Sequence, residues 1–119
     1  ISSYRDERID ACINLDGWIV PIESKIIKSG LNIPFLYIGQ EFWKDSPLNY
    51  KKLDSLIESS NGTRLLINDT KHYDFSDTPQ FSPLARTFGI SGKMNRTALK
   101  DTLNQRILNF YNKHLLTIQ

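Results

Sequence analysis

Residues 9–18 read IDACINLDGW, and this stretch decides the fold. Its apolar run from Ile9 to Leu15 is short and nearly continuous, as in a strand that is buried on both faces of a parallel sheet. Asp16 and Gly17 then end the run, because both residue types favour turns. We therefore predict a central parallel strand over residues 9–15. Its end carries an ionisable side chain, which is where open α/β sheets place their chemistry.

Residues 65–77, LLINDTKHYDFSD, repeat this arrangement further along the chain. We predict a strand over residues 63–67, followed by a loop over residues 68–79 that carries His72. Between the two stretches, residues 35–38 form an apolar run that is stopped by Gly39, and we predict a strand there as well. All three strands should be parallel neighbours, with Asp16 and His72 at the same edge of the sheet.

Two helices are predicted, the first from its cap and both from their apolar spacing. Ser46-Pro47 is typical of a helix start, and apolar residues then recur on one face until residues 59–62 end the helix. Residues 95–116 place apolar side chains at steps of three and four, as in an amphipathic helix that covers one face of a sheet. Residues 75–92 are irregular, with one helical turn near residues 83–88. The order of elements is that of the C-terminal portion of a doubly wound, mostly parallel α/β sheet.

Composition narrows the class of protein. The chain has 119 residues, which allows one domain at most and is short for a doubly wound enzyme. Its net charge is +2 and its basic residues are scattered, so nucleic acid is not an expected partner. The apolar stretches are too short to span a bilayer. One cysteine and two histidines are too few for a disulfide framework or a zinc site, and we predict no metal and no cofactor.

Three Asn-x-Thr sequons begin at Asn61, Asn68 and Asn95. Such sequons accept glycans in secreted proteins, so they point to a secreted or periplasmic location. A chance occurrence of the same tripeptides is equally compatible with the sequence, and the location is left open.

Asp16 and His72 are the candidate catalytic residues. An aspartate after one strand and a histidine after a later one follow the chain order Ser, Asp, His of α/β-hydrolase triads. Histidine suits the role of base because its unperturbed pKa lies at roughly 6.5. The structural alternatives are a turn-capping aspartate and an exposed loop histidine. The chain contains no G-x-S-x-G, so a serine nucleophile would have to lie upstream.

Several motifs resemble the platelet-activating factor acetylhydrolase family of the plasma, isoform II-like type. RIDACINLDGW (residues 8–18), followed by Pro21, is similar to the family segment that bears the catalytic aspartate. IPFLYIGQEF (residues 33–42) resembles the family's next strand, and His72 with Phe75 resembles its His-x-x-Phe segment. Residues 104–115 resemble its closing helix. The similarity spans nearly the whole chain.

The resemblance implies a serine-dependent carboxylic ester hydrolase, of the acetylhydrolase or phospholipase A2 kind, in which Asp16 is the triad acid and His72 the general base. Residues 1–119 would be the C-terminal part of one α/β-hydrolase domain, and the nucleophile-bearing N-terminal part would be absent from this chain. The implied partners are the upstream half of the same enzyme and an ester or phospholipid substrate, with peripheral contact with lipid surfaces as a further option. Without its upstream half, the chain should be inactive.

Two aromatic residues near the strand ends, Trp18 and Phe42, are candidates for substrate binding, with simple packing as the alternative. Two other functions stay open. One is a related serine hydrolase that acts on other esters, polyesters or peptides. The other is a non-catalytic α/β module that binds a partner. If the triad interpretation is right, the Asp16 carboxylate should lie about 2.6–3.2 Å from a ring nitrogen of His72.

Overall fold

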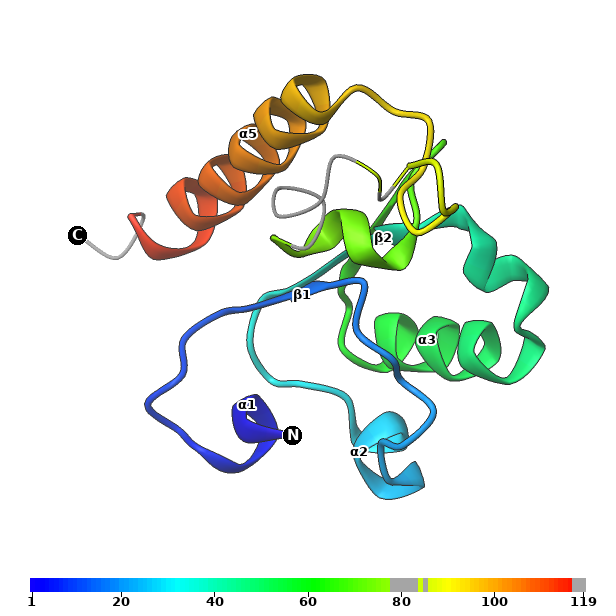
Figure 1. Ribbon diagram of the computed structural model, residues 1–119. Coiled ribbons are helices and arrows are strands. Elements are labelled where there is room, and N and C mark those ends of the chain that lie inside the picture. The colour runs from blue at the N-terminus through cyan, green and yellow to red at the C-terminus, as the bar shows by residue number, and fades with distance from the viewer. Residues whose placement is uncertain (78–83, 85, 117–119) are drawn as a thin grey trace.

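The computed structural model describes residues 1–77, 84 and 86–116. Within these residues the centre is a three-stranded parallel sheet with helices on both faces (Figure 1). The strands are β1 (Cys12–Leu15), β2 (Phe35–Gln40) and β3 (Thr63–Ile67), and β2 lies in the middle. The prediction of parallel neighbouring strands is confirmed, and the architecture is of the α/β class.

Two strand boundaries differ from the prediction, and the pairing explains both. β1 begins at Cys12 rather than at Ile9, and Cys12 pairs with Phe35, the first residue of β2. Pro34 precedes Phe35 and has no N–H group, so the ladder cannot continue beyond the bond from Cys12 N to Pro34 O. β2 extends to Gln40 because Gly39 and Gln40 pair with the last two residues of β3.

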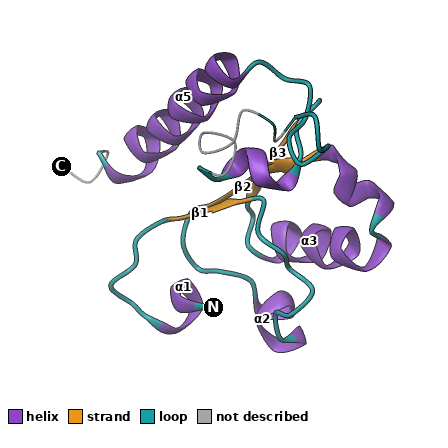
Figure 2. Cartoon of the chain, in the orientation of Figure 1, coloured by secondary structure: helices purple, strands orange, loops and turns teal. Residues whose placement is uncertain are grey.

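The helical elements alternate with the strands along the chain (Figure 2). Both predicted helices are present, and the predicted cap of the first, Ser46, is its N-cap. Asn95 is the N-cap of the second. The short elements α1, α2, η1 and η2 were not predicted as helices. The bounds are α1 (Ser2–Arg5), α2 (Ser24–Ser29), the 3₁₀ helix η1 (Glu41–Asp45), α3 (Pro47–Ser59), the 3₁₀ helix η2 (His72–Phe75) and α5 (Arg96–Leu115).

Two apolar clusters, one on each face of the sheet, form the core. Side chains of a strand alternate between its faces, so Phe35 and Tyr37 of β2 pack with α2 and α3, whereas Leu36 and Ile38 pack with α5. Figure 1 shows this layering, with α5 on one side of the sheet and α2 and α3 on the other. The carboxyl ends of the strands therefore lie between two covered faces.

The predicted helical turn near residues 83–88 lies partly outside the described residues. Where the chain is described, Phe88 N donates to Leu84 O at 3.0 Å, which is the spacing of one helical turn. None of the helices in the described part of the chain is both long enough and apolar enough to cross a membrane.

Candidate active site

Asp16 follows directly on β1 and turns the chain away from the strand. Its φ of 50° lies in the left-handed region, which aspartate tolerates better than most residues. Its main-chain N–H still donates to Ile38 O at 2.7 Å, so the turn is fixed to β2. The Asp16 side chain is completely buried. A buried carboxylate needs several hydrogen-bond donors around it, because burial removes its water shell.

The end of β2 provides these donors. The Gln40 main-chain N–H donates to Asp16 Oδ1 at 2.8 Å, and its side-chain Nε2 donates to Asp16 Oδ2 at 2.9 Å. The hydroxyl of Tyr37 adds a longer contact with Oδ1, at 3.4 Å. Gly39 leaves room for the carboxylate, because a Cβ at this position would overlap Asp16 Oδ1. These three residues of β2 form a cradle around the Asp16 carboxylate.

His72 completes the set of donors. Its ring nitrogen Nδ1 lies 2.8 Å from Asp16 Oδ2, although the two residues are separated by 56 positions in the sequence. An ionised carboxylate only accepts hydrogen bonds, so the proton of this bond lies on Nδ1. The neutral ring then presents Nε2 as its acceptor nitrogen. With its side chain 53% exposed, His72 is accessible from outside, in contrast to Asp16.

The segment that carries His72 is held by a second carboxylate, that of Asp74. Asp74 Oδ2 accepts hydrogen bonds from Lys71 N at 2.8 Å and from Gly92 N at 2.7 Å. The Ser91 hydroxyl also donates to Asp74 Oδ1. Asp74 thus connects η2 with residues 91–92, just before α5.

The connection from β3 to η2 has its own supports. Thr70 is completely buried, and its hydroxyl donates to Ile67 O at 2.7 Å, at the end of β3. Met94 N donates to Asp69 O at 3.0 Å. These bonds fix the path from the sheet to His72, so His72 is placed by the loop as well as by its contact with Asp16.

The two predicted substrate-binding residues lie in short segments after β1 and β2. Trp18 is 61% exposed, two positions after Asp16, and Phe42 is 49% exposed, two positions after Gln40. About half or more of each residue is exposed in this chain. Their assignment to substrate binding stays a prediction. Neither lines the pocket described below.

The loop that carries Trp18 is anchored by α3. Asn49, which is completely buried, accepts hydrogen bonds from Ile19 N at 2.8 Å and Val20 N at 3.2 Å. Lys52 Nζ donates to Val20 O at 2.6 Å and to Ile22 O at 2.9 Å. Trp18 therefore stands exposed between two buried neighbours, Asp16 and Ile19.

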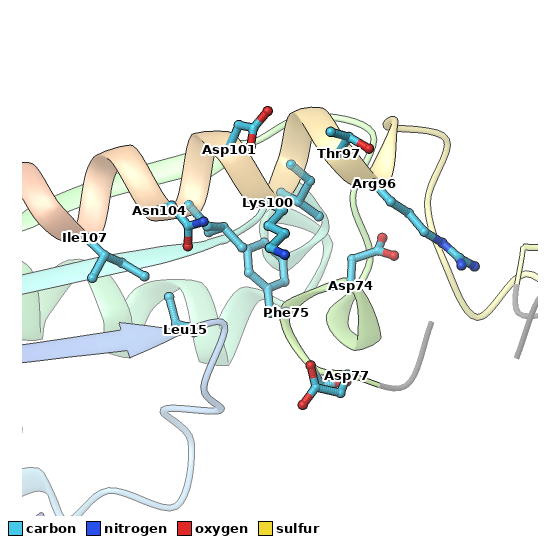
Figure 3. A pocket seen from close by; sticks show the side chains of 13 residues that line it. Leu15, Asp74, Phe75, Asp77, Arg96, Thr97, Lys100, Asp101, Asn104 and Ile107 are labelled. Carbon is cyan, nitrogen blue, oxygen red and sulfur yellow. The ribbon is translucent and has the colours of Figure 1, made fainter. Parts of the chain in front are cut away.

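A pocket of about 700 Å³ lies between α5, the end of β1 and the chain that follows His72 (Figure 3). Leu15 and Phe75 form its apolar wall opposite α5, and Arg96 and Lys100 bring positive charge from the helix. Neither Asp16 nor His72 lines it. The pair therefore does not lie inside the pocket, although Leu15 and Asp74, which line it, are close to Asp16 and His72 in the sequence.

Sequence reasoning missed several residues of this site. Gln40 and Tyr37 in the cradle, and Asn49 and Lys52 under the Trp18 loop, were not singled out. A signal for Gln40 was present, because it is the first polar residue after the apolar run of β2, as Asp16 is after β1. In the described part of the chain, no three His, Cys, Asp or Glu side chains come together as metal ligands.

Comparison with known proteins identifies the family. The model of the family "platelet-activating factor acetylhydrolase, isoform II" matches residues 1–118. This chain belongs to that family. It is also similar to the platelet-activating factor acetylhydrolase of Gallus gallus, with 28% identity over 118 residues and 96% of this chain covered. The chain spans only 28% of the length of that relative.

Proposed function

We propose that this chain supplies the acid and the base of a serine-dependent carboxylic ester hydrolase of the acetylhydrolase or phospholipase A2 kind. The observation that carries the proposal is the 2.8 Å contact between His72 Nδ1 and the buried Asp16 carboxylate. A carboxylate bonded to one ring nitrogen, with the ring open to the outside, is the arrangement that Ser-His-Asp triads use. The family membership of residues 1–118 supports the same chemistry.

In this proposal each group has one task. His72 Nε2 removes the proton from the serine hydroxyl as the serine oxygen attacks the ester carbonyl, and then gives this proton to the leaving alcohol. Water repeats the sequence on the acyl-enzyme and releases the acid. Asp16 keeps the His72 proton on Nδ1 and stabilises the imidazolium that forms in each step. Asp16 itself is not protonated during the cycle.

The nucleophile and the oxyanion donors belong, in this proposal, to an upstream half of the same domain. In the described part of the chain β1 pairs with β2 alone, so its other edge is available for a further strand. Parallel sheets are usually buried, and an unpaired strand edge invites pairing. An upstream half packed along β1 would bring its serine towards the carboxyl ends of the strands, where Asp16 and His72 already lie.

The proposed substrate is an ester with an apolar part, such as a phospholipid or an acetyl ester. Trp18 and Phe42 are exposed aromatic residues close in sequence to Asp16 and Gln40, at the ends of β1 and β2. We assign them to contact with this apolar part. Aromatic side chains bind apolar groups through a large contact area. Hydrolysis of other esters, polyesters or peptides is the competing assignment, and comparison of kcat/KM among these substrates decides between them.

The test is the substitution His72→Ala in the complete enzyme. It should lower turnover of an acetyl ester by roughly four to six orders of magnitude, because only binding and oxyanion stabilisation remain. The matched control is His114→Ala, which removes the other histidine of the chain, in the last turn of α5. Near-normal turnover by the His72 variant would reject His72 as the base.

A further inference from the structure

We infer that Gln40 is a positioning residue for the Asp16–His72 pair: it fixes the carboxylate so that Oδ2 faces the His72 ring. The inference rests on the proposed function, since it assigns a role within the same site. It concerns the Gln40 side-chain amide, which neither the strand pattern nor the triad requires.

The geometry separates Gln40 from the other neighbours of Asp16. One residue bonds both carboxylate oxygens, with its main-chain N–H 2.8 Å from Oδ1 and its amide Nε2 2.9 Å from Oδ2. A carboxylate held at both oxygens cannot rotate about its Cβ–Cγ bond without losing a hydrogen bond. His72 Nδ1 bonds the same Oδ2, at 2.8 Å. The Gln40 amide and the imidazole therefore share one acceptor atom.

Burial makes the Gln40 side-chain amide important for the Asp16 carboxylate. Asp16 is 0% exposed and Gln40 is 7% exposed, so water cannot easily replace a lost donor. An ionised carboxylate accepts hydrogen bonds only, and therefore the amide must present its NH₂ group and not its oxygen. Hydrogen bonds to charged groups are stronger than those between neutral groups, and more so away from water.

Gln40 also connects the acid with the strand that leads to the base. Its main chain pairs with Ile67 at the end of β3, and the chain reaches His72 five residues later. The Thr70 hydroxyl bonds the carbonyl of the same Ile67. Gln40 thus bonds Asp16 through its side chain while its main chain is paired with the strand before His72.

The experiment compares Gln40→Leu and Gln40→Glu in the complete enzyme. Gln40→Leu removes the donor, and we expect kcat for an acetyl ester to fall about 10- to 100-fold with KM changed less than about twofold. Gln40→Glu keeps the shape but places a carboxylate against Asp16 Oδ2. Relative to the wild type at the same pH, its kcat should be lower than that of Gln40→Leu at neutral pH and should recover in part at lower pH, where the new carboxyl group is protonated and can donate. The ratio to the wild type is the quantity compared, because both enzymes lose activity when His72 itself is protonated.

A spectroscopic measurement separates positioning from a loss of fold. The proton on His72 Nδ1 should give a far-downfield NMR signal in the wild type, and this signal should shift or broaden in both Gln40 variants. Gln105→Leu, which makes the same change on the exposed side of α5, is the matched control and should alter neither turnover nor signal. Circular dichroism should show native secondary structure in every variant.

The outcomes distinguish this inference from the proposed function. If His72→Ala is inactive while both Gln40 variants keep wild-type kcat, pH profile and NMR signal, the role of Gln40 is wrong and the triad stands. If His72→Ala keeps near-normal turnover, the triad and the role of Gln40 both fail. If Gln40→Leu does not fold, the isosteric Gln40→Glu decides, and an unchanged pH profile in that variant overturns the inference.

Discussion

The two halves of the Asp16–His72 pair are held in opposite ways. Asp16 is completely buried at the end of a strand, and the donors from β2 reach it from within the sheet. His72 has a half-exposed side chain on a four-residue 3₁₀ helix, and its segment is tied down from outside the sheet through Asp74. Asp16, the proposed acid, thus lies in the core, whereas His72, the proposed base, lies on a surface turn that hydrogen bonds hold in place.

This difference fits the roles that we propose for the two groups. An acid that only orients and stabilises its partner works best where its geometry is fixed and water is excluded. A base has to meet the nucleophile and the leaving group, so one side of its ring must be reachable. The contrast predicts that substitutions on the acid side change the pH dependence of turnover, whereas substitutions around the base mainly change stability and rate.

The largest effect on the acid side is expected for Asp16→Asn in the complete enzyme. An asparagine amide can donate to His72 Nδ1, which favours the tautomer with its proton on Nε2 and blocks the base. Turnover should fall about 10⁴-fold, as it does when the aspartate of a serine protease triad is replaced by asparagine. Part of the rate should return at high pH, because hydroxide can then remove the nucleophile's proton in place of the imidazole.

Turnover measured against pH checks this prediction, with Asp10→Asn as the control. Asp10 is an exposed aspartate just before β1, and its variant should follow the wild-type profile. An Asp16→Asn variant with a wild-type rate would show that the buried carboxylate serves the fold alone. A large loss that is constant with pH would argue against tautomer control.

A smaller effect is expected for Asp74→Asn. The oxygen of the new amide can still accept from Lys71 N and Gly92 N, and its NH₂ group can donate to the Ser91 hydroxyl oxygen, but the three bonds lose the negative charge that strengthens them. Loss of this charge should lower the melting temperature by roughly 5 °C, and turnover by about tenfold. Calorimetry and kinetics on the same preparation measure both. An unchanged melting temperature would mean that Asp74 does not brace His72.

The sequence predicted the elements whose signals are local. The cap at Ser46, the apolar spacing of the two long helices and the apolar runs of the three strands depend on short-range patterns, and the structure confirms these elements. The start of β1 was wrong because it depends on Pro34, a residue of the partner strand. α2 was missed because it has only six residues, of which Ile26 and Ile27 are buried, too few to show a helical period.

The candidate site was likewise predicted in part. The contact between Asp16 and His72 followed from their places after two parallel strands, and the structure has it within the predicted distance. The cradle was missed because its one signal, the polar Gln40 after Gly39, is equally typical of a turn. The role of Asp74 depends on residues 91–92, which reach it only through the tertiary fold. The catalytic roles themselves stay predictions.

The most direct test of the central claim is a double-mutant cycle on Asp16 and His72 in the complete enzyme. Turnover of an acetyl ester is measured for His72→Ala, for Asp16→Asn and for the double variant. If Asp16 acts only through His72, the double variant should be within about threefold of His72→Ala, since residues that act as a unit are strongly non-additive. A further loss of about 10⁴-fold in the double variant would contradict the claim, because Asp16 would then act independently of His72.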